Sequence, residues 1–479
     1  MASMSSYFIK NVFDAKSNKA SFVKGEKYRF TVLTERLIRM EYSPSGVFED
    51  RPTELVTFRN FAPINFNVTE TETLLEIKTK YFTLAYVKNK PFVGSKITTG
   101  NTLKVNLNDS DKEWYYGNPE VRNFGGINYS LDNFTGNLKL NKGLYSMDGF
   151  TAIDDSNSLV LNGEDNFINR ENPETDVYLF VYRRDFGQCL KDYYELTGYP
   201  SLIPRYALGN WWYKNERYST NDIYDVINKF EDNNIPLSIM VLGDKWHDNT
   251  NNFTFDSNLI DIGSVVNFLK SKDIKLSVKI NPELGVGPSD RMYPEMSKYL
   301  GGTSNLSLLP LDMTRLALYF NLFVKPLQSS GVTFFNIGYN DPKNLTNLWM
   351  LNHYHYTELP LILGTRGLIL SRNSMIAPHR YPVIYTGRTN ASWETINAIP
   401  YYNLSASNIG VSFIAHALGG FHGGVESSEL YMRYIELGTF SPIFLLASDG
   451  GKYYKREPWR WNQMNLGVIR EYMQLRHRL

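Results

Sequence analysis

The sequence predicts an α/β protein in which a (β/α)8 barrel of the TIM type follows an N-terminal antiparallel β-sandwich. The chain has 479 residues, which is too long for one ordinary hydrophobic core. Up to residue 200, apolar and polar residues alternate between short turn-like breaks, as in antiparallel strands. From residue 201 onward, short apolar runs alternate with helical segments, as in the βα units of a parallel sheet. We therefore expect two domains, residues 1–200 and residues 201–479.

The N-terminal part contains segments with the two-residue period of half-buried strands. Examples are KYRFTVLTERLIRMEYS, TLLEIKTKYFTLAYV and DVYLFVYRRD. Because alternate side chains of a strand point to opposite faces, such segments pack one face on a core and expose the other. Several strands of this kind, joined by short turns, favour a sandwich of two antiparallel sheets.

The second part contains eight apolar runs, one for each strand of a barrel. In order, they are ALGNWWY, LSIMVLGDKWH, KLSVKINPELG, VTFFNIGY, GLILSR, PVIYTGR, VSFIAHALGG and PIFLLASDG. Helices are expected near residues 221–233, 262–272, 293–299, 315–328, 346–358, 392–405, 427–437 and 464–478. Eight strands with eight crossovers predict a (β/α)8 barrel, whose chemistry takes place at the C-terminal ends of its strands.

The residues at those strand ends include many aromatic and basic side chains. They are Trp211–Trp212, Gly243 to His247, Asn281 to Glu283, Gly338–Tyr339, Ser371–Arg372, Gly387–Arg388, His416–Ala417 and Ala447 to Asp449. The fourth run ends on a glycine, Gly338, where a barrel enzyme would hold a catalytic side chain. A pair of opposed carboxylates is missing from this set.

Several longer motifs identify the family that the chain resembles. They are LIRMEYSPSGVFEDRPT in the N-terminal part and LWMLNHYHY, LSRNSMIAPHRYP, ASNIGVSFIAHALGGFHGG, ELYMRYIELGTFSPI and KREPWRW in the barrel part. Over nearly its whole length, the chain resembles glycoside hydrolase family 31, the α-glucosidase family of retaining enzymes. The resemblance also implies that β-domains, present after the barrel in family members, are absent here.

At the catalytic positions, the chain departs from the family that it resembles. The resemblance places the nucleophile, an Asp, at Gly338, and the acid/base, another Asp, at Arg388. Other pocket positions are changed as well, at Gly243, Lys245, Ala417 and Ala447. Trp246, Arg372 and His416 are kept. We expect a catalytically degenerate member without catalytic residues.

The chemistry of the two replaced positions supports this expectation. Retaining glycoside hydrolysis needs two carboxyl groups about 5–5.5 Å apart, one as nucleophile and one as acid and then base. The glycine at position 338 has no nucleophile. The arginine at position 388 cannot act as a general acid near neutral pH, because a guanidinium group does not give up its proton in proteins. A minor alternative is an α-glycosidase or transglycosylase whose carboxylates have moved to Asp244, Asp341, Glu283 or Asp449.

Two non-catalytic functions remain. The first is a structural or interaction role in an assembly, with a protein partner or a homo-oligomer; Tyr-rich segments at 401–403 and 452–455 are candidate interface residues. The second is carbohydrate binding. The possible ligand-binding residues are Trp211, Lys245, Trp246, Arg372, Arg388 and His416. Lys245 and Arg388 could bind an anionic group, or they could pair with Asp244, Asp449 or Glu283 and close the pocket.

Composition and motifs exclude several classes of partner, cofactor and cross-link. The net charge of +1 gives no reason to expect nucleic acid or an anionic membrane as a partner. Seven His without ligand spacing and the lack of a nucleotide motif predict no metal and no cofactor. The single cysteine, Cys189, excludes an internal disulfide framework. We see no signal peptide and no apolar stretch of membrane-spanning length, so a cytoplasmic location is expected.

Overall fold

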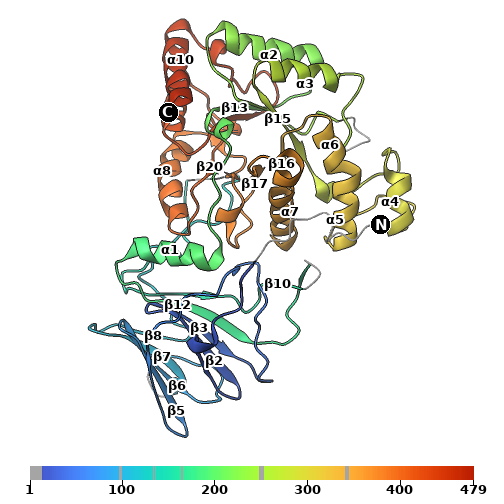
Figure 1. The fold of residues 1–479 in the computed structure, drawn as a ribbon. Coiled ribbons are helices and arrows are strands. Elements are labelled where there is room, and N and C mark those ends of the chain that lie inside the picture. The colour runs from blue at the N-terminus through green and yellow to red at the C-terminus, as the bar shows by residue number, and fades with distance from the viewer. Residues whose placement is uncertain are drawn as a thin grey trace.

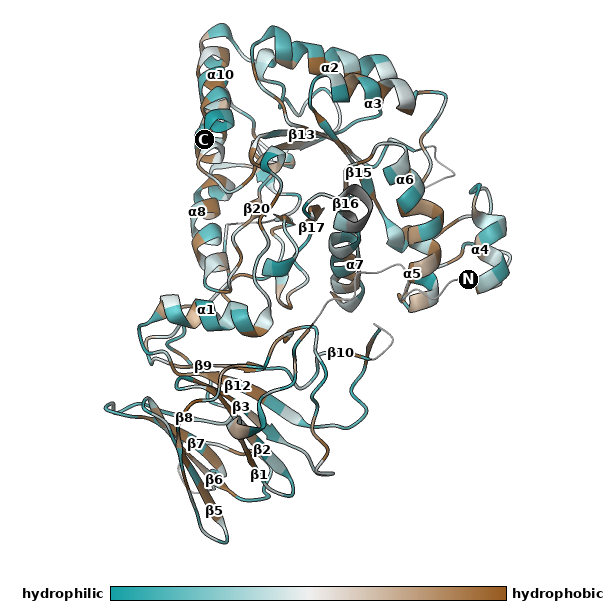
Figure 2. Ribbon diagram, viewed as in Figure 1, coloured by the Kyte–Doolittle hydropathy of each residue, from teal (hydrophilic) through white to brown (hydrophobic). Residues whose placement is uncertain are grey.

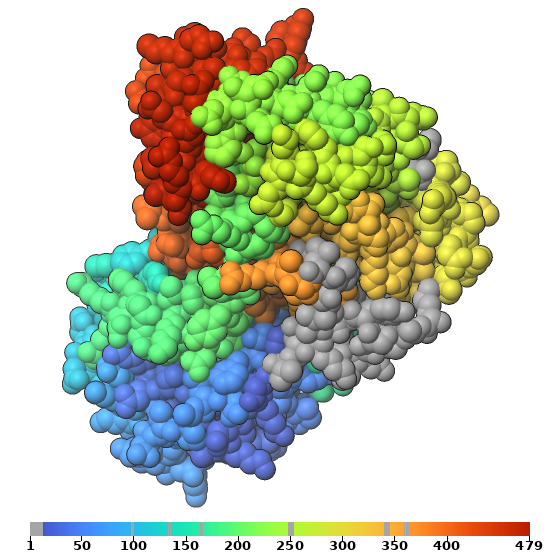
Figure 3. All heavy atoms as spheres, turned by 45° about the horizontal axis from the view of Figure 1, so that its top comes forward, coloured from blue at the N-terminus to red at the C-terminus, as the bar shows by residue number. Residues whose placement is uncertain are grey.

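The computed structural model describes residues 13–96, 100–132, 134, 136–162, 166–247, 253–339 and 345–479. A β-rich N-terminal part lies below a larger α/β part. In Figures 1 and 3, the blue residues near the N-terminus are therefore at the bottom and the red residues near the C-terminus at the top. The predicted architecture of a sandwich followed by a (β/α)8 barrel is confirmed.

The N-terminal part consists of two five-stranded antiparallel sheets. One has the order β1 (Phe22–Lys24), β2 (Tyr28–Thr34), β3 (Leu37–Tyr42), β12 (Thr175–Phe180), β9 (Thr151–Asp154). The other has the order β4 (Asn67–Glu70), β5 (Leu74–Lys78), β6 (Phe82–Val87), β7 (Leu103–Leu107), β8 (Glu113–Tyr115). Apolar residues gather on these strands (Figure 2). In β5, Leu75 and Ile77 are buried while Glu76 between them is exposed, as the alternating pattern predicts.

Helix α1 (Phe186–Thr197) was not expected in a region predicted as strands. Asp185 caps its first turn by accepting a hydrogen bond from the Gln188 N–H, 3.3 Å away. Its apolar face buries Cys189, Tyr193 and Leu196 against the sandwich. The helix lies between the two parts of the molecule (Figure 1).

The barrel is an eight-stranded parallel sheet closed on itself. Its strands are β13 (Asn210–Asn215), β14 (Ile239–Leu242), β15 (Lys275–Ile280), β16 (Phe334–Ile337), β17 (Ile369–Ser371), β18 (Ile384–Tyr385), β20 (Ile414–Ala415) and β22 (Phe444–Asp449). All neighbouring pairs are parallel. Parallel bridges from Ala415 to Ile443 and from Leu418 to Leu446 close the last seam.

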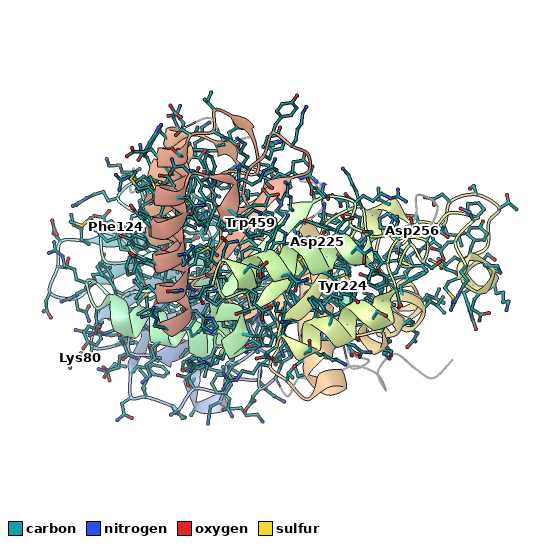
Figure 4. All side chains as sticks on the ribbon, turned by 90° about the horizontal axis from the view of Figure 1, so that it is seen from above. Lys80, Phe124, Tyr224, Asp225, Asp256 and Trp459 are labelled. Carbon is teal, nitrogen blue, oxygen red and sulfur yellow. The ribbon has the colours of Figure 1, made fainter. Side chains whose placement is uncertain are left out.

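Helices surround the barrel at nearly the expected positions. They are α2 (Thr220–Asp232), α3 (Ile262–Ser271), α4 (Tyr293–Leu300), α5 (Met313–Tyr319), α6 (Lys325–Ser329), α7 (Leu345–Leu363), α8 (Trp393–Ser407), α9 (Ser428–Thr439) and α10 (Gln463–Arg478). The single helix expected near 315–328 is divided by a π-helical turn over Phe320–Val324. Helices α2 and α3 pack side by side, with the rings of Tyr224 and Phe268 4.4 Å apart (Figure 4).

Short elements complete the description. Two-stranded ribbons pair β10 (Val160–Leu161) with β11 (Phe167–Ile168) and β19 (Asn390–Ala391) with β21 (His422–Gly424). Single 3-10 turns are Lys19–Ser21, Arg205–Leu208, Pro282–Leu284, Pro378–Arg380 and Pro458–Arg460. The last of these turns carries Trp459, whose ring meets that of Phe230 at 4.9 Å (Figure 4).

One segment of the N-terminal part reaches the barrel. It lies between β8 and β9 in sequence, and it contacts β18 and α8. The Leu131 N–H donates to the Thr386 carbonyl at 2.6 Å, and the Tyr402 hydroxyl donates to the Tyr129 carbonyl at 2.8 Å. These contacts place the next residue of the segment, Asp132, beside the C-terminal ends of the barrel strands.

Candidate functional site

Among the described residues, the C-terminal ends of the strands line a small cavity. Its volume is about 20 Å³. It brings together three of the residues predicted from the sequence, namely Gly338, Arg372 and Arg388. The other side chains around it are Tyr213, Lys279, Asn336, Ile337, Tyr339, Tyr385 and Phe421. We call this region, together with Asp132, Asp244 and Asn281, the barrel mouth.

Gly338 has no room for a side chain. Its N–H donates to the Ile280 carbonyl at 2.7 Å, which holds the backbone against β15. A Cβ atom at this position would lie 1.9 Å from the Asn281 Oδ1 atom. The space that a nucleophile would enter is therefore occupied by Asn281, whose Nδ2 donates to Asp244 at 2.9 Å.

A second asparagine closes the position at Gly243. A Cβ atom there would lie 2.3 Å from the Asn215 Oδ1 atom and 2.9 Å from the Asn215 Cα atom. The same Oδ1 accepts a hydrogen bond of 2.7 Å from the Asp244 N–H. Because a backbone atom is also in the way, a side chain at position 243 would require the backbone to shift.

Two basic residues approach the Asp244 carboxylate. The Lys279 ammonium is 2.6 Å from Oδ1, and the Arg388 guanidinium is 3.6 Å from Oδ2. Burial alone would raise the pKa of Asp244, but Lys279 and the hydrogen bond from Asn281 hold it below its usual range. Asp244 is therefore an ionised carboxylate at neutral pH.

Burial acts in the other direction on Lys279. It lowers the pKa of the ammonium, and the charges of Arg388 and Arg372 lower it further, while Asp244 opposes both. The surroundings thus stabilise the charged form of Asp244, whereas they destabilise the charged form of Lys279. The difference follows from their positions, since the lysine is the more deeply buried partner and also faces two other cations.

Arg372 and Arg388 also contact Asp132. The Arg372 Nη1 atom is 2.6 Å from Asp132 Oδ2, and the Arg388 N–H donates to Asp132 Oδ1 at 2.8 Å. Gly387 makes this approach possible with a φ of +104°, because a Cβ atom there would lie 2.5 Å from Arg372 Nη1. A carboxylate from the N-terminal part therefore closes one side of the barrel mouth.

The two tryptophans that could have stacked on a sugar are buried. The strand end expected at Trp211–Trp212 is corrected to Asn215, so Trp211 lies near the start of β13, inside the barrel. Its exposure is 0%, and its ring packs against Phe334 at 5.4 Å. Trp246 is 2% exposed and donates to the Lys279 carbonyl at 2.6 Å. Neither residue lines the cavity.

His416 likewise lies away from the cavity. It is buried between β20 and α8, with Nε2 2.8 Å from the Asn403 Oδ1 atom and Nδ1 3.0 Å from the Thr386 hydroxyl. Burial lowers its pKa to about 3, so the ring is neutral at physiological pH. Its contacts are those of a residue that holds a helix on a strand.

The other predicted positions are scattered around the barrel mouth. Lys245 is exposed and has no ion pair among the described residues. Asp449 accepts a hydrogen bond of 3.3 Å from the Asn215 amide. Ala417 and Ala447 are buried in the barrel interior. Asp341 lies outside the described residues. The proposed closing ion pair thus forms between Arg388 and Asp244, but not with Lys245.

Four residues of the barrel mouth were not singled out in the sequence. Lys279 and Asn336 interrupt apolar strands, and a polar residue at an inward position of a barrel strand is a detectable signal. Asn281 was seen only as part of a strand end. Asp132 gave no signal, because 240 residues separate it from its partner Arg372.

A buried acidic cluster in the sandwich has the geometry for a cation. One oxygen each of Glu41, Glu174 and Asp176 lie within 4.8 Å of one another. Arg39 contacts both Glu41 and Asp176, and Arg170 contacts Asp176 and Glu174. With Arg29, which binds Glu41 at 2.7 Å, three guanidinium groups face the three carboxyl groups, so the residues present do not fit a metal. Among the described residues, no helix is long and apolar enough to cross a membrane.

Comparison with known proteins gives consistent results. The family model described as "Glycosyl hydrolases family 31 TIM-barrel domain" matches residues 200–479. An alpha-xylosidase from Saccharolobus solfataricus is 24% identical over 338 residues, covering 63% of this chain and 45% of the relative. Neutral alpha-glucosidase C of Homo sapiens is 25% identical over 342 residues, covering 61% and 37%. The chain thus spans less than half the length of these curated relatives.

The fold has solved counterparts as well. A Flavobacterium johnsoniae GH31 dextranase, complexed with glucose, superposes with a TM-score of 0.72 at 15% identity. The match covers 97% of this chain and 68% of that chain. A GH31 alpha-xylosidase from a soil metagenome, complexed with xylose, gives 0.70 at 15% identity, covering 96% and 84%. At this identity, the similarity concerns the fold.

Proposed function

The chain belongs to glycoside hydrolase family 31, and on that premise we propose that it is a catalytically inactive member with a structural or protein-interaction role in an assembly. Its homologues are named as glycosidases. One observation carries the proposal: the described residues that line the barrel-mouth cavity include no carboxylate, and they include three cations, Lys279, Arg372 and Arg388.

The two catalytic roles have no candidates at the family positions. The nucleophile position is Gly338, and the Asn281 side chain fills the adjacent space. The acid/base position is Arg388, and a guanidinium group does not serve as a general acid in proteins. Its fixed positive charge also opposes the positive charge that develops on the sugar in the transition state.

Asp244 is the strongest candidate for a relocated carboxylate, and its surroundings argue against it. Its pKa is held low, so it cannot donate a proton to a leaving group. As a nucleophile, it would first have to break its ion pair with Lys279. The second carboxylate near the mouth, Asp132, is bound by Arg372. Together, these contacts favour an inactive site over a relocated one.

A hydrolysis assay tests the inactive state. We expect the purified chain to release no product from aryl α-glucosides and aryl α-xylosides at millimolar concentration beyond the buffer rate. An active family member serves as the positive control. Asp244→Asn should behave as the wild type, and so should the exposed control Asp273→Asn. Turnover that Asp244→Asn abolishes and Asp273→Asn preserves would refute the proposal and establish relocated catalysis.

Carbohydrate binding at the barrel mouth has little structural support. The cavity of about 20 Å³ is far below the roughly 300 Å³ at which small-molecule pockets begin. Trp211 and Trp246 have no exposed face on which a sugar could stack. Calorimetric titration with glucose, xylose and glucuronate at millimolar concentration should therefore give no saturable heat. A saturable heat that is lost in Arg372→Gln would reverse this conclusion.

Helix α8 supports the interaction role. Trp393, Tyr401 and Leu404 share one outward face of the helix and are 46%, 48% and 68% exposed. Glu394 is the only charged residue of the helix. Beyond Glu394 in the first turn, the helix carries no charge, so this face is compatible with a second copy of itself, as a two-fold interface requires. We therefore propose self-association of the chain through α8.

Sedimentation velocity tests this interface. We expect a concentration-dependent dimer in the micromolar range that Leu404→Lys abolishes. Leu202→Lys is the matched control, because Leu202 is 67% exposed but lies outside α8. A chain that stays monomeric at every concentration, or a dimer that Leu404→Lys leaves intact, would contradict self-association through this face.

A further inference from the structure

The barrel mouth holds more positive than negative charge. Among the described residues, three cations, Lys279, Arg372 and Arg388, face two carboxylates, Asp132 and Asp244. Lys279 and Arg372 are only 9% and 12% exposed. An unbalanced positive charge in a partly desolvated site is costly unless a counter-charge approaches it.

Hydrogen-bond donors are also in excess at the same place. The Asn336 Nδ2 atom and the Tyr385 hydroxyl oxygen are buried without a hydrogen-bond partner in the part of the chain that the structure describes. Both side chains line the cavity, and their residues are 3% and 5% exposed. An unpaired buried polar group in a native protein indicates a water molecule or an ion that completes its contacts. The Asn336 Nδ2 atom only donates and the Tyr385 hydroxyl can donate, so one acceptor in the cavity could serve both groups.

We propose that the barrel mouth binds a small monovalent anion, of which chloride is the simplest. The anion would accept hydrogen bonds from Asn336 and Tyr385. It would also balance the positive charge of Lys279 and Arg388 that the shared Asp244 does not compensate. This inference goes beyond the proposed function and does not depend on it, because anion binding requires neither a partner nor loss of catalysis.

Size decides which anions fit. The cavity of about 20 Å³ holds one water-sized atom, since a water needs roughly 10–15 Å³ measured in this way. A single-atom anion fits, whereas a sulfate or phosphate would have to displace side chains. The excess of one positive charge likewise favours a monoanion, because Asp132 and Asp244 would repel a second negative charge.

The site is accessible from solvent. The side chains of Arg388, Asp132 and Asp244 are 39%, 36% and 27% exposed. An anion can therefore enter between them while the fold stays intact. The guanidinium of Arg388 lies over the Phe421 ring, 5.6 Å from its centre, which keeps it beside the cavity.

A crystal of the full chain soaked in sodium bromide gives the direct test. We expect an anomalous bromine peak inside the cavity, within hydrogen-bonding distance of Tyr385 and Asn336. A cavity that holds ordinary water density without an anomalous signal would overturn the proposal, because a neutral acceptor then satisfies the donors. Bromine peaks confined to the molecular surface would overturn it equally.

Thermal unfolding in solution gives the second test. A ligand that binds only the native state raises the unfolding temperature in a saturable way. At constant ionic strength, replacing sodium gluconate with sodium chloride or bromide should therefore raise Tm along a saturation curve. An equal Tm in all three salts would contradict anion binding.

Variants locate the effect in the barrel mouth. Tyr385→Phe keeps the ring and removes one donor, so the apparent affinity for bromide should fall about 2- to 10-fold, the factor that one hydrogen bond contributes. Tyr206→Phe is the matched control, since its hydroxyl is also buried and unpartnered but lies near the start of β13. An identical bromide response in Tyr385→Phe and the wild type would mean that bromide does not bind at the barrel mouth.

Arg388→Gln separates charge from hydrogen bonding. This partly exposed residue can be replaced without opening a buried void, and its loss leaves two cations facing two carboxylates. The saturable rise in Tm should then disappear. A variant that still responds to bromide as the wild type does would show that charge balance does not drive the binding.

Discussion

Two buried charge networks, one in the sandwich and one at the barrel mouth, are built in different ways. In the sandwich, Arg39 binds Asp176 through two hydrogen bonds of 2.8 and 2.7 Å, and Arg29 binds Glu41 through two of 2.7 Å. These are paired fork-like contacts, the strongest geometry that arginine and carboxylates form. All four side chains are at most 5% exposed.

At the barrel mouth, the contacts are single and the balance is uneven. Arg388 reaches Asp244 only at 3.6 Å, and three cations face two carboxylates among the described residues. The sandwich network can also adjust its charge by a proton, because burial and the neighbouring Asp176 and Glu41 raise the pKa of Glu174 to about 8. An arginine at the mouth cannot release its proton. The difference teaches that the first network is a paired structural brace, while the second keeps positive charge that its carboxylates do not fully compensate.

The largest effect should come from breaking the brace. Asp176→Asn leaves Arg39 and Arg170 without their shared carboxylate, and loss of one partner of a buried pair typically costs about 3–5 kcal/mol. Urea denaturation measures the change in unfolding free energy. Glu171→Gln is the control, because Glu171 is 68% exposed and its pair with Arg51 should contribute less than about 1 kcal/mol. Similar costs for both variants would mean that the buried ion pairs of Asp176 stabilise the protein no more than an exposed pair does.

At the barrel mouth, replacing the acid Asp244 should cost more stability than replacing the base Lys279. Asp244→Asn leaves Lys279 and Arg388 uncompensated, so we expect a loss of about 2–3 kcal/mol. Lys279→Met removes surplus charge while Asp244 keeps Asn281 and Arg388, so the loss should stay below about 1 kcal/mol. Urea denaturation of both variants gives the comparison. Equal losses would mean that the mouth is as balanced as the sandwich.

The pH dependence of stability should identify the proton that the sandwich network takes up. The pKa of Glu174 is raised from 4.5 to about 8 in the folded state, so the native protein binds more protons than the unfolded chain between these values. This group therefore lowers stability as pH rises from about 5 to 8. Glu174→Gln should match the wild type near pH 5 and exceed it at pH 8, on the order of 2 kcal/mol.

The measurement is urea denaturation at pH 5, 6.5 and 8, expressed as the difference between variant and wild type. Glu76→Gln serves as the control, since Glu76 is exposed on β5 and should show no such difference. A difference for Glu174→Gln that does not change with pH would mean that the carboxylate is already ionised and fully balanced by Arg170.

The sequence predicts the barrel better than it predicts the site. Apolar runs identify all eight strands, and the meeting of their ends brings Gly338, Arg372 and Arg388 together as expected. The apolar run predicts that the first strand ends before the polar Lys214, yet this lysine is buried within the strand and paired with Glu457 at 2.7 Å. Helix α1 carried an amphipathic pattern that the surrounding strands obscured.

What could not be predicted depends on distant contacts. Asp132 closes the mouth from the N-terminal part, and nothing near it in sequence indicates its partner Arg372. The aromatic residues near a strand end suggested a sugar platform, but the inward or outward direction of Trp211 and Trp246 depends on where each strand ends. A shift of a few residues converts a surface residue into a core residue.

The smallest effect should come from adding a methyl group at Gly338. In Gly338→Ala, the new Cβ would lie 1.9 Å from the Asn281 Oδ1 atom, so Asn281 must turn away and release Asp244. Because the closest atom belongs to a side chain that can turn, while the Ile280 carbonyl oxygen at 3.0 Å needs to give only slightly, we expect a cost of about 1 kcal/mol. Gly467→Ala is the matched control in α10: its Cβ would meet nothing within 4 Å, and alanine in a helix should stabilise by roughly 0.5–1 kcal/mol. Opposite signs in urea denaturation would support a mouth filled by Asn281. A stabilising Gly338→Ala would instead mean that there is room for a side chain at this position. Arg388 alone would then argue against catalysis by a carboxylate introduced there.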